Sequence, residues 1–319
     1  MRYNKIMLTN EIISIIIPVY CNEESLQELY KIINDDVIVK NENLNFEIIF
    51  IDDGSKDNSL NILQGIYNKY KPIVKVIKLS RNFGQVNAVM AGLNFCSGNY
   101  AVIMSADLQD PPGLINTMIK TANKGNRDIV IATRKGRDES IYRVITSKIF
   151  YSIMKLLSFK NMPLGGFDFF LVSRRVIDII VNDIDSNPFI QGKVLYTGFQ
   201  TEFIQYKRRK RPYGKSKWSF SKKINALIDS VLSYSYFPIR LMSLIGLLVS
   251  AAGFLYAIII IISYFHNNVP FPGWAPIMIL ILVLSGFQML MLGIIGEYLW
   301  RTLDQVRRRP KYIIDKIYQ

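Results

Sequence analysis

Two acidic residues follow a strongly apolar run of the sequence. The run Tyr100–Met104 has the character of a buried strand, and the segment SADLQDPP at 105–112 follows it with Asp107 and Asp110. An Asp at the end of a strand can accept hydrogen bonds from a ribose or a base, or hold a divalent metal ion that bridges a diphosphate. Mg²⁺ and Mn²⁺ suit the second role, because hard cations of this kind prefer one or two carboxylates together with phosphate oxygens.

Two other apolar runs end in polar residues of the same kind. The run at 13–20 leads into Cys-Asn-Glu-Glu, and the run at 46–52 leads into Asp-Asp-Gly-Ser. Ligands of an open parallel sheet bind outside the carboxyl ends of its strands, so these ends, far apart in sequence, are expected to converge on one crevice. A helix cap or a turn explains any single Asp here equally well. Three such ends together favour a nucleotide site. The sequence lacks G-x-G-x-x-G after the first run and lacks a Walker A pattern, which disfavours a dinucleotide or P-loop site.

Alternating strands and helices are expected to position these residues. Apolar runs predict strands at 13–20, 46–52, 74–79, 100–104 and 128–132. Segments with helical length and apolar spacing lie between them at 24–39, 59–70, 85–95 and 114–124. This alternation is typical of the α/β class, with a mostly parallel sheet covered by helices on both faces. Beyond residue 135 the pattern changes, and 141–157 has the spacing of a further helix.

Two long apolar segments, 241–265 and 275–295, are each long enough for a helix to cross a bilayer. The connection at 266–273 has no Lys or Arg, whereas both flanks of the pair are basic. The positive-inside rule therefore predicts two transmembrane helices with both termini in the cytoplasm. A pair of buried core helices is the alternative. No signal peptide is expected, because the apolar run near the N-terminus is short and leads into polar residues.

The net charge of +14 is concentrated, with nine basic residues and no acid between Lys207 and Lys223. A basic run just before a membrane span favours contact with anionic lipid or phosphate over a merely solvated face. Nucleic acid is not expected as a partner. An apolar stripe over 220–232 predicts an amphipathic helix in the membrane interface, or one packed on the preceding domain. The two cysteines, Cys21 and Cys96, fit a reducing compartment.

The ordered set of motifs resembles the family 2 glycosyltransferases, which have the GT-A fold. Four segments carry the resemblance: IIIPVY…NEE, IDDGSKDNS, RNFGQVNAVMAGL at 81–93 and ADLQDPP. Within the family, the chain is similar to the polyprenyl-phosphate sugar transferases, the group of the dolichol-phosphate mannose synthase and the bactoprenol glucosyltransferases. The similarity spans nearly the whole chain and includes RPYGKSKW at 211–218 and the apolar C-terminal segments.

The resemblance implies three groups of site residues. The residues expected to bind the nucleotide sugar are Pro18, Tyr20, Glu23, Asp52, Asp53, Ser105, Ala106, Asp107 and Gln109. The residues expected to bind the phosphate of the lipid acceptor are Arg134, Arg137, Arg211 and Ser216. Asp107 is the implied ligand of Mg²⁺ or Mn²⁺ and a catalytic residue, and Asp168 stands at the position usually proposed as the catalytic base.

The sequence departs from the family pattern at three places. The family usually has Asp-x-Asp at 105–107, and here the first residue is Ser105. The family often has Arg where this chain has Phe170. The segment Tyr-Cys-Asn-Glu is one residue longer than the commoner Tyr-Asn-Glu, so the register of Glu23 against Asn22 stays open. Asp110 is interpreted as a turn residue and not as a ligand.

The expected organisation has four parts. These are a cytosolic GT-A domain at 1–218, an amphipathic juxtamembrane helix at 219–238, two transmembrane helices within 239–300 around the loop at 266–273, and a basic cytosolic tail at 301–319. The expected location is a bacterial inner membrane, with the enzyme in contact with membrane lipids. A homo-oligomer is left open.

The expected activity is transfer of a sugar, with inversion, from a nucleotide diphosphate sugar to undecaprenyl or another polyprenyl phosphate, in modification of a cell-envelope glycan. Glucose and UDP are the preferred donor components, and N-acetylglucosamine or a modified sugar is the alternative. A membrane-anchored, non-catalytic nucleotide-sugar-binding protein is a competing hypothesis that Ser105 supports. A processive polysaccharide synthase is disfavoured, because the sequence lacks Gln-x-x-Arg-Trp and has few apolar segments.

Overall fold

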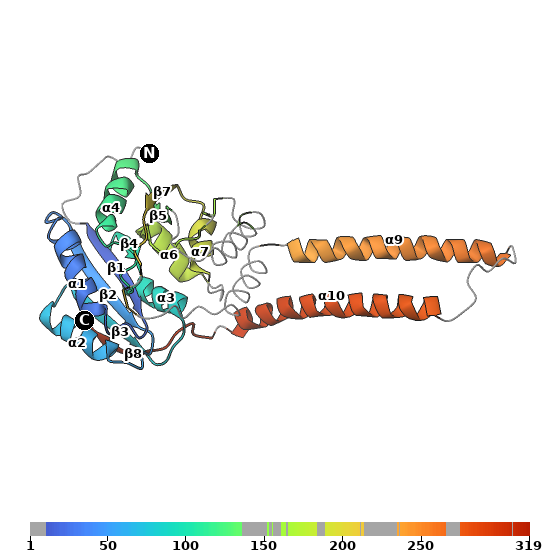
Figure 1. The fold of residues 1–319 in the computed structure, drawn as a ribbon, viewed down its shortest axis with the longest axis horizontal. Coiled ribbons are helices and arrows are strands. Elements are labelled where there is room, and N and C mark those ends of the chain that lie inside the picture. Colours follow the sequence, from blue (N-terminus) through green and yellow to red (C-terminus); the bar gives the residue numbers. More distant parts are fainter. Residues whose placement is uncertain are drawn as a thin grey trace. The chain divides into compact units, whose positions relative to one another are not determined.

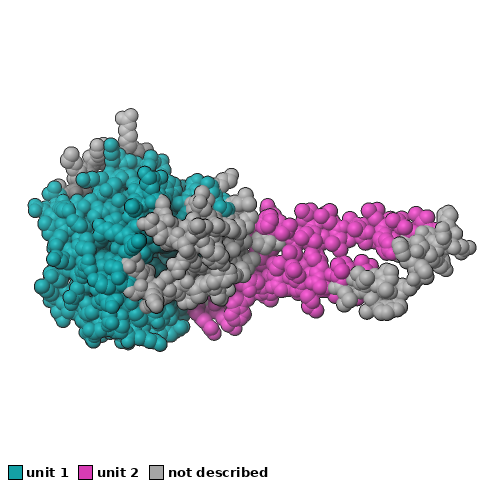
Figure 2. Space-filling model, viewed as in Figure 1, with its two compact units in different colours: residues 1–227, 310–319 teal, residues 228–309 magenta. Residues whose placement is uncertain are grey.

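The computed structural model describes residues 11–135, 161–163, 165–183, 189–210, 212–213, 237–265, 275–307 and 309–319, with the single residues 152, 155 and 235. The chain divides into two compact units (Figure 2). The first comprises residues 1–227 and 310–319, and the second comprises residues 228–309. The predicted site residues all belong to the first unit, and the long apolar segments belong to the second.

The first unit is built on a sheet whose strand order, within the described residues, is β7-β5-β6-β4-β1-β2-β3-β8. The strands are β1 (Ile12–Val19), β2 (Asn45–Asp52), β3 (Val74–Leu79), β4 (Tyr100–Ile103), β5 (Ile129–Arg134), β6 (Phe170–Ser173), β7 (Thr201–Tyr206) and β8 (Ile314–Tyr318). Neighbouring strands among β3, β2, β1 and β4 are parallel, and so are β5 and β7, whereas β6 and β8 run antiparallel to their partners. The predicted α/β class with a mostly parallel sheet is confirmed.

Helices cover both faces of this sheet (Figure 1). They are α1 (Leu26–Ile33), which continues as the π-helical turn Asn34–Ile38, α2 (Ser59–Lys69), α3 (Gln85–Phe95), α4 (Leu114–Gly125), α6 (Arg174–Asn182) and α7 (Ile190–Tyr196). Buried residues of α1, α2 and α4 join one hydrophobic cluster with Ile13, Ile15 and Ile17 of β1. Helix α3 packs on the opposite face, where a Cβ at Gly92 would lie 2.5 Å from Ile16 Cγ2. The near-continuous Ile/Val runs predicted such two-sided burial.

The strand β8 is an element that the sequence interpretation did not contain, since it treated 301–319 as a basic tail. The strand pairs antiparallel with β3 and is tied to it by an ion pair of 2.5 Å between Lys78 and Asp315. Gln64 Nε2 and Tyr67 Oη of α2 donate to Tyr318 Oη and Gln319 O, at 2.7 and 2.8 Å. Charged residues on a short edge strand are usual in natural sheets, and they hide its apolar pattern.

The second unit contains α9 (Phe237–Phe265) and α10 (Ala275–Arg307), which contact each other. Both are long and apolar enough to cross a membrane, judged by length and composition, and within the windows Ile239–Tyr256 and Val283–Arg307 none of the described side chains is buried. The two helices include the predicted spans 241–265 and 275–295. The helices predicted at 141–157 and 219–238 fall almost entirely outside the described residues.

Candidate active site

The polar residues expected at the site gather along the carboxyl-end edge of the sheet. Strands β1, β2, β4, β5 and β7 all end at this edge because they run in the same direction. Strand β6 runs the opposite way and therefore begins there, with Phe170 beside Ile103 in the register. Asp168, just before β6, consequently lies at the same edge as Asp107, just after β4.

The loops that follow β1 and β2 are joined by hydrogen bonds. Cys21 N donates to Ser55 Oγ at 2.9 Å, and Glu23 Oε2 accepts from Asn58 N at 2.8 Å, beside the start of α2. Cys21 has a φ of +53°, so the additional residue of this segment is accommodated as a left-handed bulge. Glu23 thus fixes the two loops to each other. Tyr20 is half-buried, and Pro18 is buried. Pro18 lies in β1 beyond the last residue that pairs with β4, so its missing N–H costs no hydrogen bond to that strand.

Asp52 and Asp53 are neighbours with different tasks. Both side chains are almost fully buried, and burial raises the pKa of each. Asp53 accepts hydrogen bonds from Phe83 N at 2.7 Å and Gly84 N at 2.9 Å, one on each oxygen, so it braces the loop after β3. Asp52 accepts from Ser55 N at 3.3 Å. Asp53 is thus held by the loop after β3, and Asp52 by the turn that follows β2.

The segment after β4 is folded around Ser105. Its hydroxyl lies 2.8 Å from Asp107 Oδ1 and 3.0 Å from Asp110 Oδ2. Asp107 Oδ1 also accepts from Gln109 N at 3.1 Å, which closes a turn whose Leu108 has a φ of +58°. A leucine in the left-handed region costs about 1–2 kcal/mol, and the hydrogen bonds of Asp107 on both sides of it hold this conformation. Ala106 is buried and its carbonyl accepts from Ser25 Oγ at 2.7 Å.

Asp110 has a larger role than the turn residue that the sequence indicated. Its side chain is fully buried and accepts hydrogen bonds from Tyr206 Oη and, at 3.2 Å, from Arg208 Nε. Arg208 Nη2 lies 4.0 Å from Asp107 Oδ2, so one guanidinium faces both carboxylates. Tyr206 and Arg208 were not expected at the site. Arg208 belongs to the basic run 207–223, which was expected to contact anionic lipid or phosphate, but no sequence pattern tied either residue to the acids after β4.

The predicted acceptor side contains an ion pair. Arg134 Nη2 lies 2.5 Å from Asp168 Oδ2, and Gln191 Nε2 donates to Asp168 Oδ1 at 3.2 Å. Burial would lower the pKa of Arg134, but Asp168, Tyr206 and Asp110 outweigh it and raise that pKa, so the guanidinium stays charged. Arg134 is 11 % exposed and Asp168 is 37 % exposed, which leaves the carboxylate the more accessible partner. Arg137, Arg211 and Ser216 lie outside the described residues.

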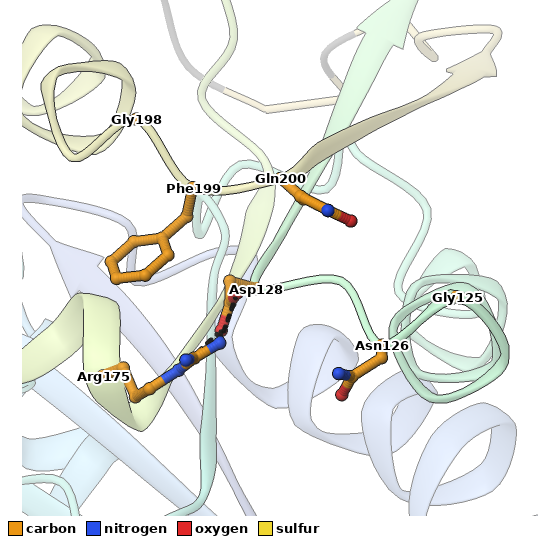
Figure 3. Close-up of a pocket in the computed structure, with 7 residues that line it drawn as sticks. All are labelled: Gly125, Asn126, Asp128, Arg175, Gly198, Phe199 and Gln200. Carbon is orange, nitrogen blue, oxygen red and sulfur yellow. Dashed lines mark hydrogen bonds and ion pairs between the residues drawn. The ribbon is translucent and has the colours of Figure 1, made fainter. Parts of the chain in front are cut away.

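A separate pocket of about 390 Å³ lies at the opposite edge of the sheet (Figure 3). Its residues precede β5 and β7 or belong to α4 and α6. Asp128 and Arg175 form an ion pair of 2.7 Å across it, and the Arg175 guanidinium lies 5.1 Å from the Phe199 ring centroid. This pocket is therefore distinct from the carboxyl-end site.

The motif implies Mg²⁺ or Mn²⁺, and Asp107 is the carboxylate that could hold such an ion. Among the described residues, no three His, Cys, Asp or Glu side chains gather as a metal site. Asp107 is 8 % exposed and has Gln109 beside it, whereas Asp110 is fully enclosed by its own partners. One carboxylate fits an ion that takes its other ligands from phosphate oxygens and water, as Mg²⁺ usually does.

Residues 14–180 match the family described as glycosyl transferase family 2, and relatives of known sequence match almost the whole chain. The chain belongs to this family. It is 34 % identical to the uncharacterized glycosyltransferase YkcC of Bacillus subtilis, over 96 % of this chain and 94 % of that protein. It is 33 % identical to the SfII prophage-derived bactoprenol glucosyl transferase of Shigella flexneri, over 96 % and 98 %.

The undecaprenyl-phosphate 4-deoxy-4-formamido-L-arabinose transferase of Proteus mirabilis is also 33 % identical, over 96 % of this chain and 93 % of that one. Among solved structures, glucosyl-3-phosphoglycerate synthase from Mycobacterium tuberculosis in complex with Mn²⁺ and UDP-glucose matches with a TM-score of 0.47 and 17 % identity. That match covers 70 % of this chain and 78 % of the synthase. The family 2 membership makes this protein a glycosyltransferase.

Proposed function

We propose that this glycosyltransferase transfers a sugar from a nucleotide diphosphate sugar to a polyprenyl phosphate. Glucose, UDP and undecaprenyl phosphate are the preferred components. The observation that carries the proposal is similarity over nearly the full length, apolar C-terminal helices included, to proteins named for transfer to bactoprenol or undecaprenyl phosphate. Modification of a cell-envelope glycan is the proposed purpose.

The donor is placed over the ends of β1, β2 and β4. Asp52 binds the base or ribose, and the segment Ser105–Gln109 faces the diphosphate. Mg²⁺ or Mn²⁺ held at Asp107 would supply positive charge against the charge that develops on the departing nucleoside diphosphate. Arg208, 4.0 Å from Asp107 Oδ2, adds a fixed positive charge from the protein itself.

The acceptor phosphate is placed at the end of β5 and the start of β6. Its second pKa is near 6, so at neutral pH a phosphomonoester is already largely a dianion and needs little deprotonation. Asp168 therefore orients the nucleophile, or takes a proton from the monoanionic minority. Arg134 holds Asp168 in place through their ion pair. In-line attack from this side inverts the anomeric carbon.

The same proposal places α9 and α10 across a bacterial inner membrane, with the catalytic domain and both termini in the cytosol. Strand β8 follows the second unit in the chain and yet joins the same sheet as β1–β7. Both ends of the second unit must then lie on one side of the membrane, which requires an even number of crossings. The boundaries remain those expected from the sequence: a catalytic domain at 1–218, the juxtamembrane helix at 219–238, spans within 239–300, and 301–319 returning to the domain.

The decisive experiment supplies membranes containing the full chain with a panel of radiolabelled nucleotide sugars and undecaprenyl phosphate. The expected result is one labelled, lipid-extractable product, formed preferentially from UDP-glucose and lost in Asp107→Asn. Label from UDP-N-acetylglucosamine instead would change the sugar and keep the reaction. Binding of a nucleotide sugar without labelled lipid or donor hydrolysis would support the non-catalytic alternative.

A further inference from the structure

One continuous series of contacts joins the two halves of the carboxyl-end site. It begins at Asp107, whose Oδ1 lies 2.8 Å from Ser105 Oγ, and the same hydroxyl lies 3.0 Å from Asp110. Asp110 then accepts from Tyr206 Oη. Tyr206 lies opposite Arg134 in the β5–β7 register, and the Arg134 side chain is close enough to influence the pKa of the Tyr206 hydroxyl. Arg134 ends the series in its ion pair with Asp168.

Asp110 lies at the centre of this series, and its environment is unusual for a charge. The side chain is fully buried, and a carboxylate withdrawn from water is costly unless charged or polar groups surround it. Ser105, Tyr206 and Arg208 supply those groups, from β4 on one side and from the end of β7 on the other. An apolar side chain would fill the same volume without any such partners, so packing alone does not account for an acid here.

Backbone contacts join the same two segments beside Asp110. Arg209 N donates to Gln109 O at 2.9 Å, and Gln109 Nε2 donates to Arg209 O at 3.3 Å. The strand β7 pairs with β5, and β6 separates β5 from β4 in the sheet. The chain leaving β7 therefore passes the end of β5 and the start of β6 to reach the loop after β4. Gln109 and Asp110 form the hydrogen bonds with this segment.

We propose that Asp110 is a positioning residue that sets the orientation of Asp107 and of Arg134 together. Through Ser105 and Arg208 it fixes the carboxylate that faces the donor diphosphate. Through Tyr206 it fixes the guanidinium that holds Asp168 at the acceptor. The identity of the donor and the acceptor in this inference rests on the proposed function. The contacts of Asp110 do not, because all of them are made within the protein.

The first test measures the affinity of purified full-length protein for Mn²⁺ and UDP by calorimetry, without any acceptor. Asp110→Asn keeps the shape of the side chain and removes its charge. The expected result is a loss of Mn²⁺-dependent UDP affinity of about 10- to 100-fold, as is typical when a group that orients a metal ligand is changed.

The second test measures initial rates with the lipid acceptor. Tyr206→Phe keeps the ring, which packs edge-on against Phe169, and is expected to raise the acceptor KM more than it weakens UDP binding.

A matched control exists at the opposite edge of the sheet. Asp128 is also a buried acid, bonded to a serine, Ser173, and an arginine, Arg175. Asp128→Asn is expected to lower the midpoint of thermal unfolding about as much as Asp110→Asn does, and to leave UDP affinity and acceptor KM unchanged. The double variant Asp110→Asn/Tyr206→Phe is expected to be non-additive in acceptor KM, because Asp110→Asn removes the charge from a contact that Tyr206→Phe removes altogether.

The outcomes separate this proposal from the proposed function. If Asp110→Asn and Asp128→Asn lower the unfolding midpoint alike and both leave Mn²⁺–UDP affinity and acceptor KM at wild-type values, Asp110 is structural only and the inference is wrong. If the wild-type protein binds no nucleotide from a panel that includes UDP, the proposed function fails and the inference fails with it. If UDP binds as expected and no lipid product forms, the affinity measurement still decides for or against the positioning of Asp107.

Discussion

Asp53 and Asp110 each use their carboxylate to hold a loop, whereas their neighbours Asp52 and Asp107 are the acids proposed to bind the donor. Asp53 accepts from two backbone amides of the loop after β3, and Asp110 accepts from side chains at and beyond the end of β7. A carboxylate enclosed by hydrogen-bond donors keeps its position, because each donor left unpaired would cost about 1–3 kcal/mol of folding free energy. Asp53 and Asp110 are therefore held by segments distant in sequence, whereas Asp52 and Asp107 accept hydrogen bonds within their own turns.

Ser105→Asp tests whether position 105 belongs to the metal site. The new carboxylate would lie beside Asp107 and Asp110, so repulsion should lower the unfolding midpoint without metal, and Mn²⁺ should restore it. Metal affinity is expected to rise on the order of tenfold, because affinity for hard cations increases with ligand charge. Titration of the midpoint with Mn²⁺ measures both effects, with Ser105→Ala as the uncharged control. Unchanged Mn²⁺ affinity would place residue 105 outside the coordination shell.

Asp168→Asn tests whether the acceptor needs a base. Activity is expected to fall mainly below about pH 6, where the monoanionic phosphomonoester becomes the main species, and to stay near wild type at pH 8. The amide keeps an oxygen that can accept from Arg134 and Gln191, so the geometry is largely retained. Initial rates across this pH range measure the effect. A loss of equal size at every pH would show that Asp168 is required for more than proton removal.

At the scale of elements, the turn after β2 depends on a glycine. Gly54 has a φ of +67°, and a Cβ at this position would lie 2.6 Å from the backbone carbon of Arg81. The β2 turn and the loop after β3 therefore approach each other more closely than any other residue type allows. Asp53, next to Gly54, braces that same loop. Backbone conformation and side-chain hydrogen bonds thus hold one edge of the donor site together.

Gly54→Ala and Gly84→Ala form a matched pair for this close approach. Gly84 also has a positive φ, +95°, but a Cβ there would meet nothing within 4 Å. Gly84→Ala is expected to cost about 1–3 kcal/mol of folding free energy through strain alone. Gly54→Ala adds a backbone clash, so it is expected to cost more and also to weaken UDP binding. Unfolding midpoints and UDP affinity measure this difference, and equal effects at the two positions would contradict it.

The strands and helices that the sequence predicted well are those with long, simple patterns. Helix α3 was predicted with its observed bounds, and β1 to β4 were predicted to within a residue or so, because two-sided burial gives near-continuous apolar runs. Strands β6 and β8 were missed because β6 is short and lies beyond the regular alternation of strands and helices, and Asp315 and Lys316 interrupt the apolar pattern of β8. The strand-end acids were predicted from the parallel-sheet rule. Tyr206 and Arg208 were missed because they meet Asp110 only through the order of strands in the sheet.

At the scale of the whole molecule, the catalytic domain contains two separate parts of the chain, residues 1–227 and residues 310–319. Strand β8 follows the second unit in the chain, and it contacts α2 of the first unit. If α9 and α10 span the membrane, two separate connections attach the catalytic domain to it. Two attachments restrict the domain's rotation more than one would, which suits an acceptor phosphate held at headgroup depth.

Thiol labelling tests this topology. In a background of Cys21→Ser and Cys96→Ser, Asn268→Cys in the connection at 266–273 is expected to react with a membrane-impermeant maleimide on intact cells. Lys120→Cys, at an exposed position of α4, is expected to react only after the cells are permeabilised. Labelling of residue 120 in intact cells would place the catalytic domain outside. Protection of residue 268 in intact cells together with reaction after permeabilisation would contradict two full crossings.

The position of β8 in the chain also sets an order of events during synthesis. Residues 12–79 leave the ribosome with the outer edge of β3 unpaired, and that edge stays open until both apolar helices have been made and β8 follows. An unpaired strand edge is a site of aggregation and of recognition by chaperones. The sheet can be completed only after both apolar helices have been synthesised, so a chain whose synthesis stops before β8 leaves the edge of β3 open.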